Sequence, residues 1–281
     1  MVREIPVESV TEAVCEMCIQ ANHVLSEDME AALREAGRRE EKPLAVQIFG
    51  QLYENLKIAR EEMIPICQDT GMAVVFMNIG QDVHFTGGEL EEAVNEGVRR
   101  GYETGYLRKS VVEDPLLRVN TKDNTPAVLH VRIVPGRQVE ITVAPKGFGS
   151  ENMSRVFMLK PADGTEGIKK SVVQAVKDAG PNACPPLVVG VGIGGTFEKA
   201  ALMAKEALTR PVGSHSEKEH IRRLEEELLE EINGLFIGPG GLGGKITALA
   251  VNINTFGTHI AGLPLAVNLC CHVNRHVSRV L

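Results

Sequence analysis

The sequence predicts a mixed α+β (mixed α/β) protein, with N-terminal helices followed by β-sheet regions that carry flanking helices. In residues 8–62 apolar side chains recur at spacings of three and four, as on one face of a helix. From residue 126 to residue 144 apolar and polar side chains alternate instead, which is typical of half-buried strands. Elsewhere helical and strand-like stretches follow one another without strict alternation, which favours α+β over a repeated βαβ fold.

The first elements follow from these spacings. Three helices are predicted at 9–25, 26–40 and 42–63. PICQDTG at 65–71 then forms a polar turn that runs into an apolar strand. After two glycines, residues 89–107 have the pattern of an amphipathic helix.

The later elements are assigned in the same way. The alternating strands at 126–136 and 137–145 are expected to form a hairpin that turns at Pro135 and Gly136. KGFGSENMS at 146–154 is a glycine-rich loop. Beyond it we expect a helix at 166–180 ending at Gly180, a strand at 184–195, a helix at 196–208, a charged surface helix at 216–234, a glycine-rich loop leading into a strand at 234–256, and a last strand at 263–272.

The length of the chain allows one large domain or two. It has 281 residues, enough to bury a sizeable core. No internal repeat or low-complexity linker divides it. We therefore expect one domain over residues 1–281, with a helical part at about 1–62 and an α/β part at about 63–281.

Composition argues against two classes of partner. The net charge is −7, the pI is about 5.7 and only 4% of residues are aromatic, so neither a phosphate-binding surface nor a base-stacking platform for nucleic acid is expected. The acidic start MVREIPVESV lacks the features of a signal peptide, and no apolar stretch reaches the length of a membrane span. We expect a cytoplasmic protein that binds neither nucleic acid nor membrane.

Two glycine-rich motifs invite a nucleotide-binding interpretation. GVGIGG at 190–195 lies between a strand and a helix, but no second strand ending in an acidic residue follows it. GPGGLGGKIT at 238–247 has Pro239 and Ile246 where a phosphate loop needs Gly and Ser or Thr. A dinucleotide-binding domain remains the less favoured alternative.

The cysteines are the more informative feature. In a reducing compartment the six cysteines are expected to be metal ligands, redox groups or packed thiols. Cys15 and Cys18 lie one turn apart in a helical pattern, and we expect both to pack in the interior. The others lie on three separate turns, in PICQDTG, GPNACPP and CCHVNRH, and could together form a three-thiolate site. Zinc with a fourth ligand, or an iron–sulfur cluster with one open iron, would suit such a site.

Seven motifs together resemble one enzyme family. PICQDTG, LRKSVV, KGFGSENMS, GPNACPP, GVGIGGTFEKA, FGTHIAG and PLAVNLCCHVNRH are similar, in this order, to motifs of the iron–sulfur-dependent hydro-lyases, class I fumarase and L(+)-tartrate dehydratase. The similarity runs from about Cys67 to the C-terminus. It implies a [4Fe-4S] cluster held by Cys67, Cys184 and Cys271, with the open iron acting as a Lewis acid. The family's last motif has its cysteine directly before the histidine, as Cys271 precedes His272, so the resemblance implies that Cys270 is not a ligand. Neighbours on an extended strand point to opposite faces, which agrees with this, and Cys270 in place of Cys271 remains the alternative.

The resemblance also implies a substrate site. Asp69 would be an acid or base near the leaving hydroxyl group and His259 a second catalytic contact, while Arg108 would bind a substrate carboxylate. The residues implied in substrate binding are Gln68, Asp69, Arg108, Gly149, Asn152 and His259.

The activity implied is reversible hydration of fumarate to (S)-malate, with L(+)-tartrate dehydration as the alternative. In the family, part of the pocket belongs to a separate β subunit. We therefore expect this chain to be an α subunit that is inactive alone and assembles as α2β2. A hypothesis of another class, a non-catalytic metal-binding or dinucleotide-binding domain, stays open at this point.

Overall fold

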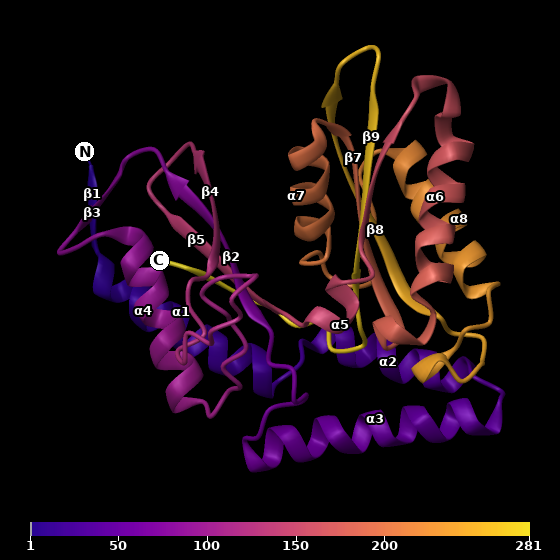
Figure 1. Cartoon of the computed structure of the whole chain (residues 1–281), viewed down its shortest axis with the longest axis horizontal. Helices are drawn as coiled ribbons and strands as arrows, with labels where there is room; N and C mark the ends of the chain where they lie inside the picture. The colour runs from indigo at the N-terminus through magenta and orange to yellow at the C-terminus, as the bar shows by residue number, and fades with distance from the viewer. Residues whose placement is uncertain (1) are drawn as a thin grey trace. The chain divides into compact units, whose positions relative to one another are not determined.

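The chain divides into two compact units that are interleaved along the sequence. A computed structural model describes residues 2–281 (Figure 1). Unit 1 contains residues up to Ser26, Asn55–Phe148 and Arg275–Leu281, and unit 2 contains Glu27–Glu54 and Gly149–Asn274. The predicted helical part at about 1–62 contributes to both units, and the assignment of one domain to residues 1–281 stays a prediction.

Unit 1 is a four-stranded sheet covered by two helices. The strand order is β10-β5-β2-β4, and a small parallel pair, β1 and β3, accompanies it. Helices α1 and α4 pack against the sheet through an apolar core that includes Val14, Met17 and Tyr102 (Figure 1). The elements are β1 (Arg3–Pro6), α1 (Val7–His23), β2 (Met72–Gly80), β3 (Val83–Thr86), α4 (Leu90–Thr104), β4 (Val128–Val134), β5 (Val139–Lys146) and β10 (Val277–Val280).

The predicted hairpin between β4 and β5 is wrong. Strand β2 lies between them, parallel to β4 and antiparallel to β5. The physical reason is burial: β2 (MAVVFMNIG) is the more continuously apolar strand and takes a central position, whereas β4 is half-exposed and takes the edge. Alternation identified both strands but not their neighbours.

Unit 2 is a second four-stranded sheet, with helices on both faces. Its strand order is β6-β9-β7-β8, with β7 parallel to β8 and antiparallel to β9. Helices α6 and α8 cover one face and α7 covers the other (Figure 1). The elements are α2 (Glu27–Arg39), α3 (Pro43–Glu62, which continues into unit 1), α5 (Phe148–Glu151, which begins in unit 1), β6 (Arg155–Leu159), η1 (Pro161–Asp163), α6 (Gly164–Ala179), η2 (Gly180–Ala183), β7 (Leu187–Gly195), α7 (Phe197–Ala207), α8 (Glu219–Asn233), η3 (Pro239–Gly241), β8 (Ala248–Thr258) and β9 (Leu263–Cys270).

The mixed α+β class is confirmed, as are the predicted helices and most of the strands. Three expectations need correction in detail. The loop KGFGSENMS contains one helical turn, α5. The short strands β1, β3, β6 and β10 were not predicted, because they are too short to show a period. The charged helix α8 is not only a solvated surface, since it buries the Glu225 carboxylate.

Apolar length sets one further limit. No helix among residues 2–281 is both long and apolar enough to cross a bilayer.

Candidate metal centre and substrate site

Cys67 lies in a turn between α3 and β2, in unit 1. The backbone N–H of Asp69 donates to Cys67 Sγ over 3.4 Å, which holds the sulfur within its own turn. The Asp69 carboxylate holds the turn in shape: Oδ1 accepts the Gly71 N–H at 3.0 Å and Oδ2 accepts the Phe148 N–H at 2.9 Å. Gly71 is required here, because its φ is +77° and a Cβ would lie 2.7 Å from the Lys146 backbone.

Side chains from α4 and the following loop support the same turn from the interior. The buried hydroxyl group of Tyr102 donates to the carbonyl oxygens of Thr70 at 2.8 Å and Gly71 at 3.0 Å. The Asn124 amide donates to the Gly71 carbonyl at 3.2 Å. Burial raises the pKa of the Tyr102 hydroxyl, so this donor keeps its proton. The turn that carries Cys67 is therefore rigid before any ligand binds.

Gln68 lies in this turn and Arg108 lies beside it, both with exposed side chains. The Arg108 N–H donates to Thr70 Oγ1 at 2.9 Å, and that hydroxyl donates back to the Arg108 carbonyl at 3.2 Å. The Arg108 guanidinium makes no ion pair within residues 2–281. Its backbone is thus held beside the Cys67 turn while its charge stays available to an anion.

In unit 2, Cys184 and Cys271 lie on turns whose backbones touch. The Cys184 carbonyl accepts the His272 N–H at 3.3 Å and His272 Nδ1–H at 3.1 Å. Cys184 is exposed with φ 53°, and Cys271 is half-buried just beyond the end of β9. Its neighbour Cys270 is the last residue of β9 and only 5% exposed. Gly149 also lies beside the Cys184 turn, because a Cβ on it would lie 3.6 Å from the Asn182 carbonyl oxygen.

The glycine-rich loop at 238–247 supports the Cys184 turn. The Gly240 N–H donates to the Pro185 carbonyl at 2.8 Å. A Cβ on Gly241 would lie 2.3 Å from Pro181 Cβ, so only glycine permits this approach.

Most backbone N–H groups of the same loop already have acceptors within the chain. The N–H groups of Lys245 and Ile246 donate to the buried Glu40 carboxylate at 2.8 and 3.3 Å. The nucleotide interpretation of this loop is therefore not supported, because an internal carboxylate already occupies its donors.

The glycines of GVGIGG likewise serve packing. A Cβ on Gly190 would lie 2.1 Å from the Ala204 carbonyl oxygen, and one on Gly192 would lie 2.1 Å from that of Ala200. Both glycines stand inside β7 and let the backbone of α7 approach the strand. A dinucleotide loop would instead place its glycines after the strand.

His259 lies at the other end of the unit 2 sheet from the two cysteines. It follows β8, whose Thr258 pairs with Gly195 at the end of β7, whereas Cys184 precedes the start of β7. The length of β7 separates these ends by roughly 25 Å. His259 is exposed, and its Nδ1 accepts the Ala261 N–H at 3.2 Å. One copy of unit 2 does not bring His259 and Cys184 together.

Asn152 and the CxxC pair complete the predicted set. Asn152 is exposed just after α5, and its carbonyl accepts the Arg155 guanidinium at 3.2 Å. Cys18 is fully buried in α1, as expected, and burial raises the pKa of its thiol. Cys15 is half-buried.

Sequence patterns missed the residues that hold these turns from within. Arg275 is 5% exposed, and its guanidinium donates to the carbonyl of Asp69. Tyr102 and Asn124 act on the same turn. No local pattern marks a buried arginine, because burial depends on elements distant in sequence.

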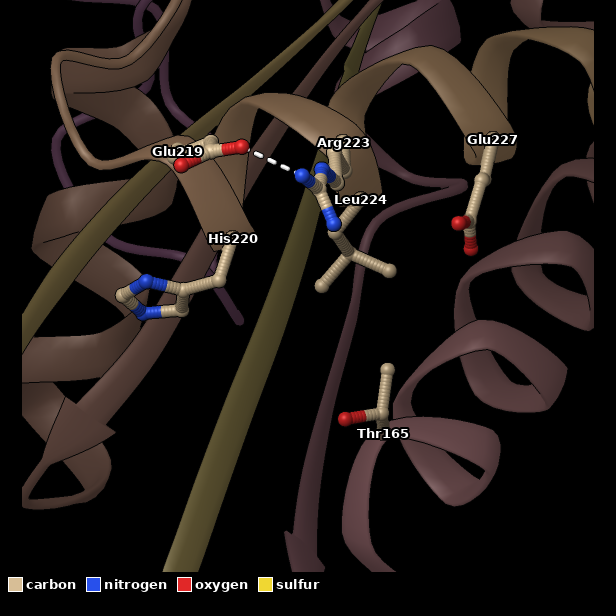
Figure 2. Close-up of a pocket in the computed structure, with 6 residues that line it drawn as sticks. All are labelled: Thr165, Glu219, His220, Arg223, Leu224 and Glu227. Atoms are coloured by element: carbon tan, nitrogen blue, oxygen red, sulfur yellow. Dashed lines mark hydrogen bonds and ion pairs between the residues drawn. The ribbon is translucent and has the colours of Figure 1, made fainter.

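A cavity of about 350 Å³ lies elsewhere in unit 2, between the first turns of α6 and α8 (Figure 2). Thr165 borders it from α6, and Arg223 and Glu219 form an ion pair at its rim. Thr165 stands at the start of α6 and Cys184 follows its end, so about 20 Å of helix separates them. None of the predicted site residues lines this cavity.

The placement of the cysteines within each unit suits a three-thiolate cluster. Cys184 and Cys271 come from touching turns, and the Asp69 N–H donates to Cys67 Sγ. Within the described residues no group of three or more His, Cys, Asp or Glu is gathered as around a metal ion. Neither unit alone could provide one from these ligands, because Cys67 belongs to unit 1 and the other two belong to unit 2.

Comparisons with known proteins agree along nearly the whole chain. A family model described as fumarate hydratase (Fumerase) matches residues 11–280. A Methanocaldococcus jannaschii protein, provisionally named L(+)-tartrate dehydratase subunit alpha, is 42% identical over 272 residues, which cover 95% of each chain. L(+)-tartrate dehydratase subunit alpha of Escherichia coli K12 is 31% identical over 273 residues, 96% of this chain and 89% of that protein. The protein of the same name from Shigella boydii serotype 4 has the same identity and coverage.

Proposed function

The chain belongs to the fumarate hydratase (Fumerase) family, and from this premise we propose that it is the α subunit of a hydro-lyase that acts on a four-carbon dicarboxylate. The observation that carries the proposal is the family match over residues 11–280, which includes all three cysteine turns. The rigid Cys67 turn and the touching Cys184 and Cys271 turns support it, because a cluster needs ligands that are held in place before it binds.

We propose Cys67, Cys184 and Cys271 as the ligands of a [4Fe-4S] cluster. When bound, such a cluster supplies one iron without a protein ligand, a Lewis acid for the hydroxyl group that leaves as water. The half-buried position of Cys271 and the buried position of Cys270 favour Cys271 as the third ligand.

The chain's own residues bind and orient the dicarboxylate. The Arg108 guanidinium binds one substrate carboxylate, and the backbone N–H at Gly149 adds a second donor. Gln68 and Asn152 offer amide groups to the same anion. Each Asp69 oxygen keeps a lone pair beyond its backbone bond, so Asp69 can hand a proton to the leaving hydroxyl group or take it back. The proton on the adjacent carbon goes to a base, for which the β subunit is the expected source.

His259 can serve this site only from a neighbouring copy. It lies roughly 25 Å from the cysteine end of its own unit, several times the length of the substrate. An α2β2 assembly contains two α chains, and we propose that the exposed His259 loop of each chain completes the site of the other. Coexpression of a His259→Asn chain with a Cys271→Ser chain should then restore activity that neither variant has alone, through mixed assemblies with one intact site. Activity in mixtures no higher than in the single variants would contradict the exchange.

Fumarate and (S)-malate are the first substrate pair to test. L(+)-tartrate is the second candidate, and the names of the bacterial and archaeal relatives favour it. Malate and tartrate differ by one hydroxyl group, so a few hydrogen-bonding contacts would decide between them. We place the reaction in the cytoplasm, where fumarate hydration would serve the citric acid cycle.

The relatives are named as alpha subunits, which supports a separate β subunit. The deciding experiment is anaerobic copurification of this chain with that partner, followed by iron and sulfide analysis and assays of fumarate hydration and tartrate dehydration. About four irons per αβ pair, and turnover of either substrate only in the complex, is the expected result. Full activity of the isolated chain would refute the need for a partner, and strict absence of iron would refute the cluster.

A matched pair of variants tests the ligand assignment. Cys271→Ser should abolish the brown absorption near ~400 nm, while Cys270→Ser should retain it. Equal loss in both variants would contradict Cys271 as the ligand.

A further inference from the structure

Arg275 is a buried cation with an incomplete set of partners. Arg275 follows β9 in sequence. Its side chain packs in unit 1, and 5% of the residue is exposed. Nε donates to the Pro145 carbonyl at 3.3 Å, and Nη2 donates to the Asp69 carbonyl. Nη1 is buried and has no hydrogen-bond partner.

The anion nearest in sequence to the acceptors of Arg275, the Asp69 carboxylate, accepts the Gly71 and Phe148 N–H groups and forms no ion pair with Arg275. No carboxylate lies within ion-pair distance of Arg275 among residues 2–281, and its two acceptors are neutral carbonyl groups. A buried guanidinium without a counter-charge is strongly disfavoured, and an orphaned N–H adds a further penalty.

The position of Arg275 indicates what the missing anion is. Asp69 receives Arg275 on its carbonyl oxygen while its own N–H points at Cys67 Sγ. The guanidinium is planar and rigid, so Nη1 stands beside the same turn as Nη2. Arg275 is therefore bound to the peptide segment that presents the Cys67 thiolate.

We propose that Arg275 is the counter-cation of the iron–sulfur centre that Cys67 helps to hold, with Nη1 as a hydrogen-bond donor to that thiolate-ligated anion. This inference rests on the proposed function. Three thiolates give the centre a net negative charge, and hydrogen bonds and nearby charge are main determinants of how tightly a protein holds such a group. A lysine could not replace the arginine fully, because one ammonium lacks the rigid fork that reaches two carbonyls and a third acceptor.

The test compares Arg275→Gln with wild type, with and without the cluster, in complex with the β partner. Glutamine removes the charge but keeps an amide that can donate to the carbonyls. The thermal midpoint of the cluster-free protein should change by less than about 3 °C, because removal of an uncompensated charge offsets a lost hydrogen bond. Anaerobic reconstitution should show about tenfold to hundredfold weaker cluster retention, measured as iron and sulfide against a chelator.

Two further variants make the result specific. Arg279→Gln removes a surface arginine from β10, whose partner is the exposed Glu16, and should leave both measurements unchanged. Arg275→Lys keeps the charge without the fork and should retain more cluster than Arg275→Gln; a reversed order would overturn the counter-charge role.

Three other outcomes would contradict the counter-cation role of Arg275. If Arg275→Gln lowers the midpoint of the cluster-free protein as much as that of the loaded one and keeps its iron, Arg275 only packs the turn and the inference fails. If cluster retention is normal and only the KM for the dicarboxylate rises, Nη1 serves the substrate and the inference is wrong. If wild type itself takes up no iron, the proposed function fails together with the inference.

Discussion

Gly241→Ala should be among the more damaging single-methyl additions to unit 2. Gly241 has φ +75°, and a Cβ there would lie 2.3 Å from Pro181 Cβ and 2.7 Å from Pro181 Cα. The clash is with a proline and with backbone, neither of which can rotate away. Pro181 begins the turn that ends at Cys184, so the added methyl group pushes directly on a proposed cluster ligand.

The expected loss has two parts. A left-handed backbone costs alanine about 1–2 kcal/mol relative to glycine. An overlap that forces backbone to move costs about 1–3 kcal/mol more. Gly213 provides a matched control, because its φ is +89° and nothing lies within 4 Å of its Cβ position. Gly213→Ala should therefore show the conformational part alone, and Gly241→Ala about 2–5 kcal/mol in total.

Urea unfolding of the cluster-free chain measures the unfolding free energy of each variant. Anaerobic reconstitution measures how much iron each variant retains. Gly241→Ala should unfold at lower urea than Gly213→Ala and should retain less iron, because Cys184 is displaced. Equal unfolding midpoints for the two variants would refute the argument that the glycine loop sets the position of the Cys184 turn.

Three other predictions concern buried polar groups. Tyr102→Phe should lower the unfolding free energy by about 1–3 kcal/mol, because the Thr70 carbonyl loses its donor; an unchanged urea midpoint would contradict this. Glu40→Gln should lower it by about 3 kcal/mol, because its carboxylate accepts four backbone N–H groups and an amide can accept only on one side; Glu41→Gln, at an exposed position, is the control for that urea measurement. Burial raises the pKa of the Cys18 thiol above its ordinary value of 9.0, so the folded state binds a proton that the unfolded state releases. The contribution of this thiol to the unfolding free energy should be fully present below about pH 9, and the unfolding free energy should fall by about 1.4 kcal/mol per pH unit above that pH. A slope between pH 9 and 10 that is the same in Cys18→Ala would show that another group is responsible.

Local patterns were sufficient wherever a structure depends on neighbours in sequence. Helices α1, α4 and α6 follow from apolar spacing, and Gly180 ends α6 as predicted. The pairing of strands does not follow from such patterns. The order β5-β2-β4 depends on which strand is buried on both sides, and that is a property of the assembled sheet.

The residues of the candidate site also fall into those that local motifs predict and those whose position depends on the assembled fold. The cysteine turns, Asp69 and Arg108 were predicted as site residues from short motifs that resemble a known family, because chemistry demands particular residues at particular places. The position of His259 was not, since only the sheet register shows that it lies at the opposite end from Cys184. The glycine loops were also misleading in isolation, because a positive φ looks the same whether it serves a phosphate group or a neighbouring helix.

By itself, then, the sequence determined most of the element types, the family and the residues that we propose as iron ligands. Only the tertiary structure decided that Glu40 occupies the amides of the glycine-rich loop and that Arg275 is buried beside the Cys67 turn with an unused donor. The physical reason is that burial and counter-charge are set by groups far apart in the chain. Arg275 meets Asp69 across more than half of the sequence, and no local pattern records that distance.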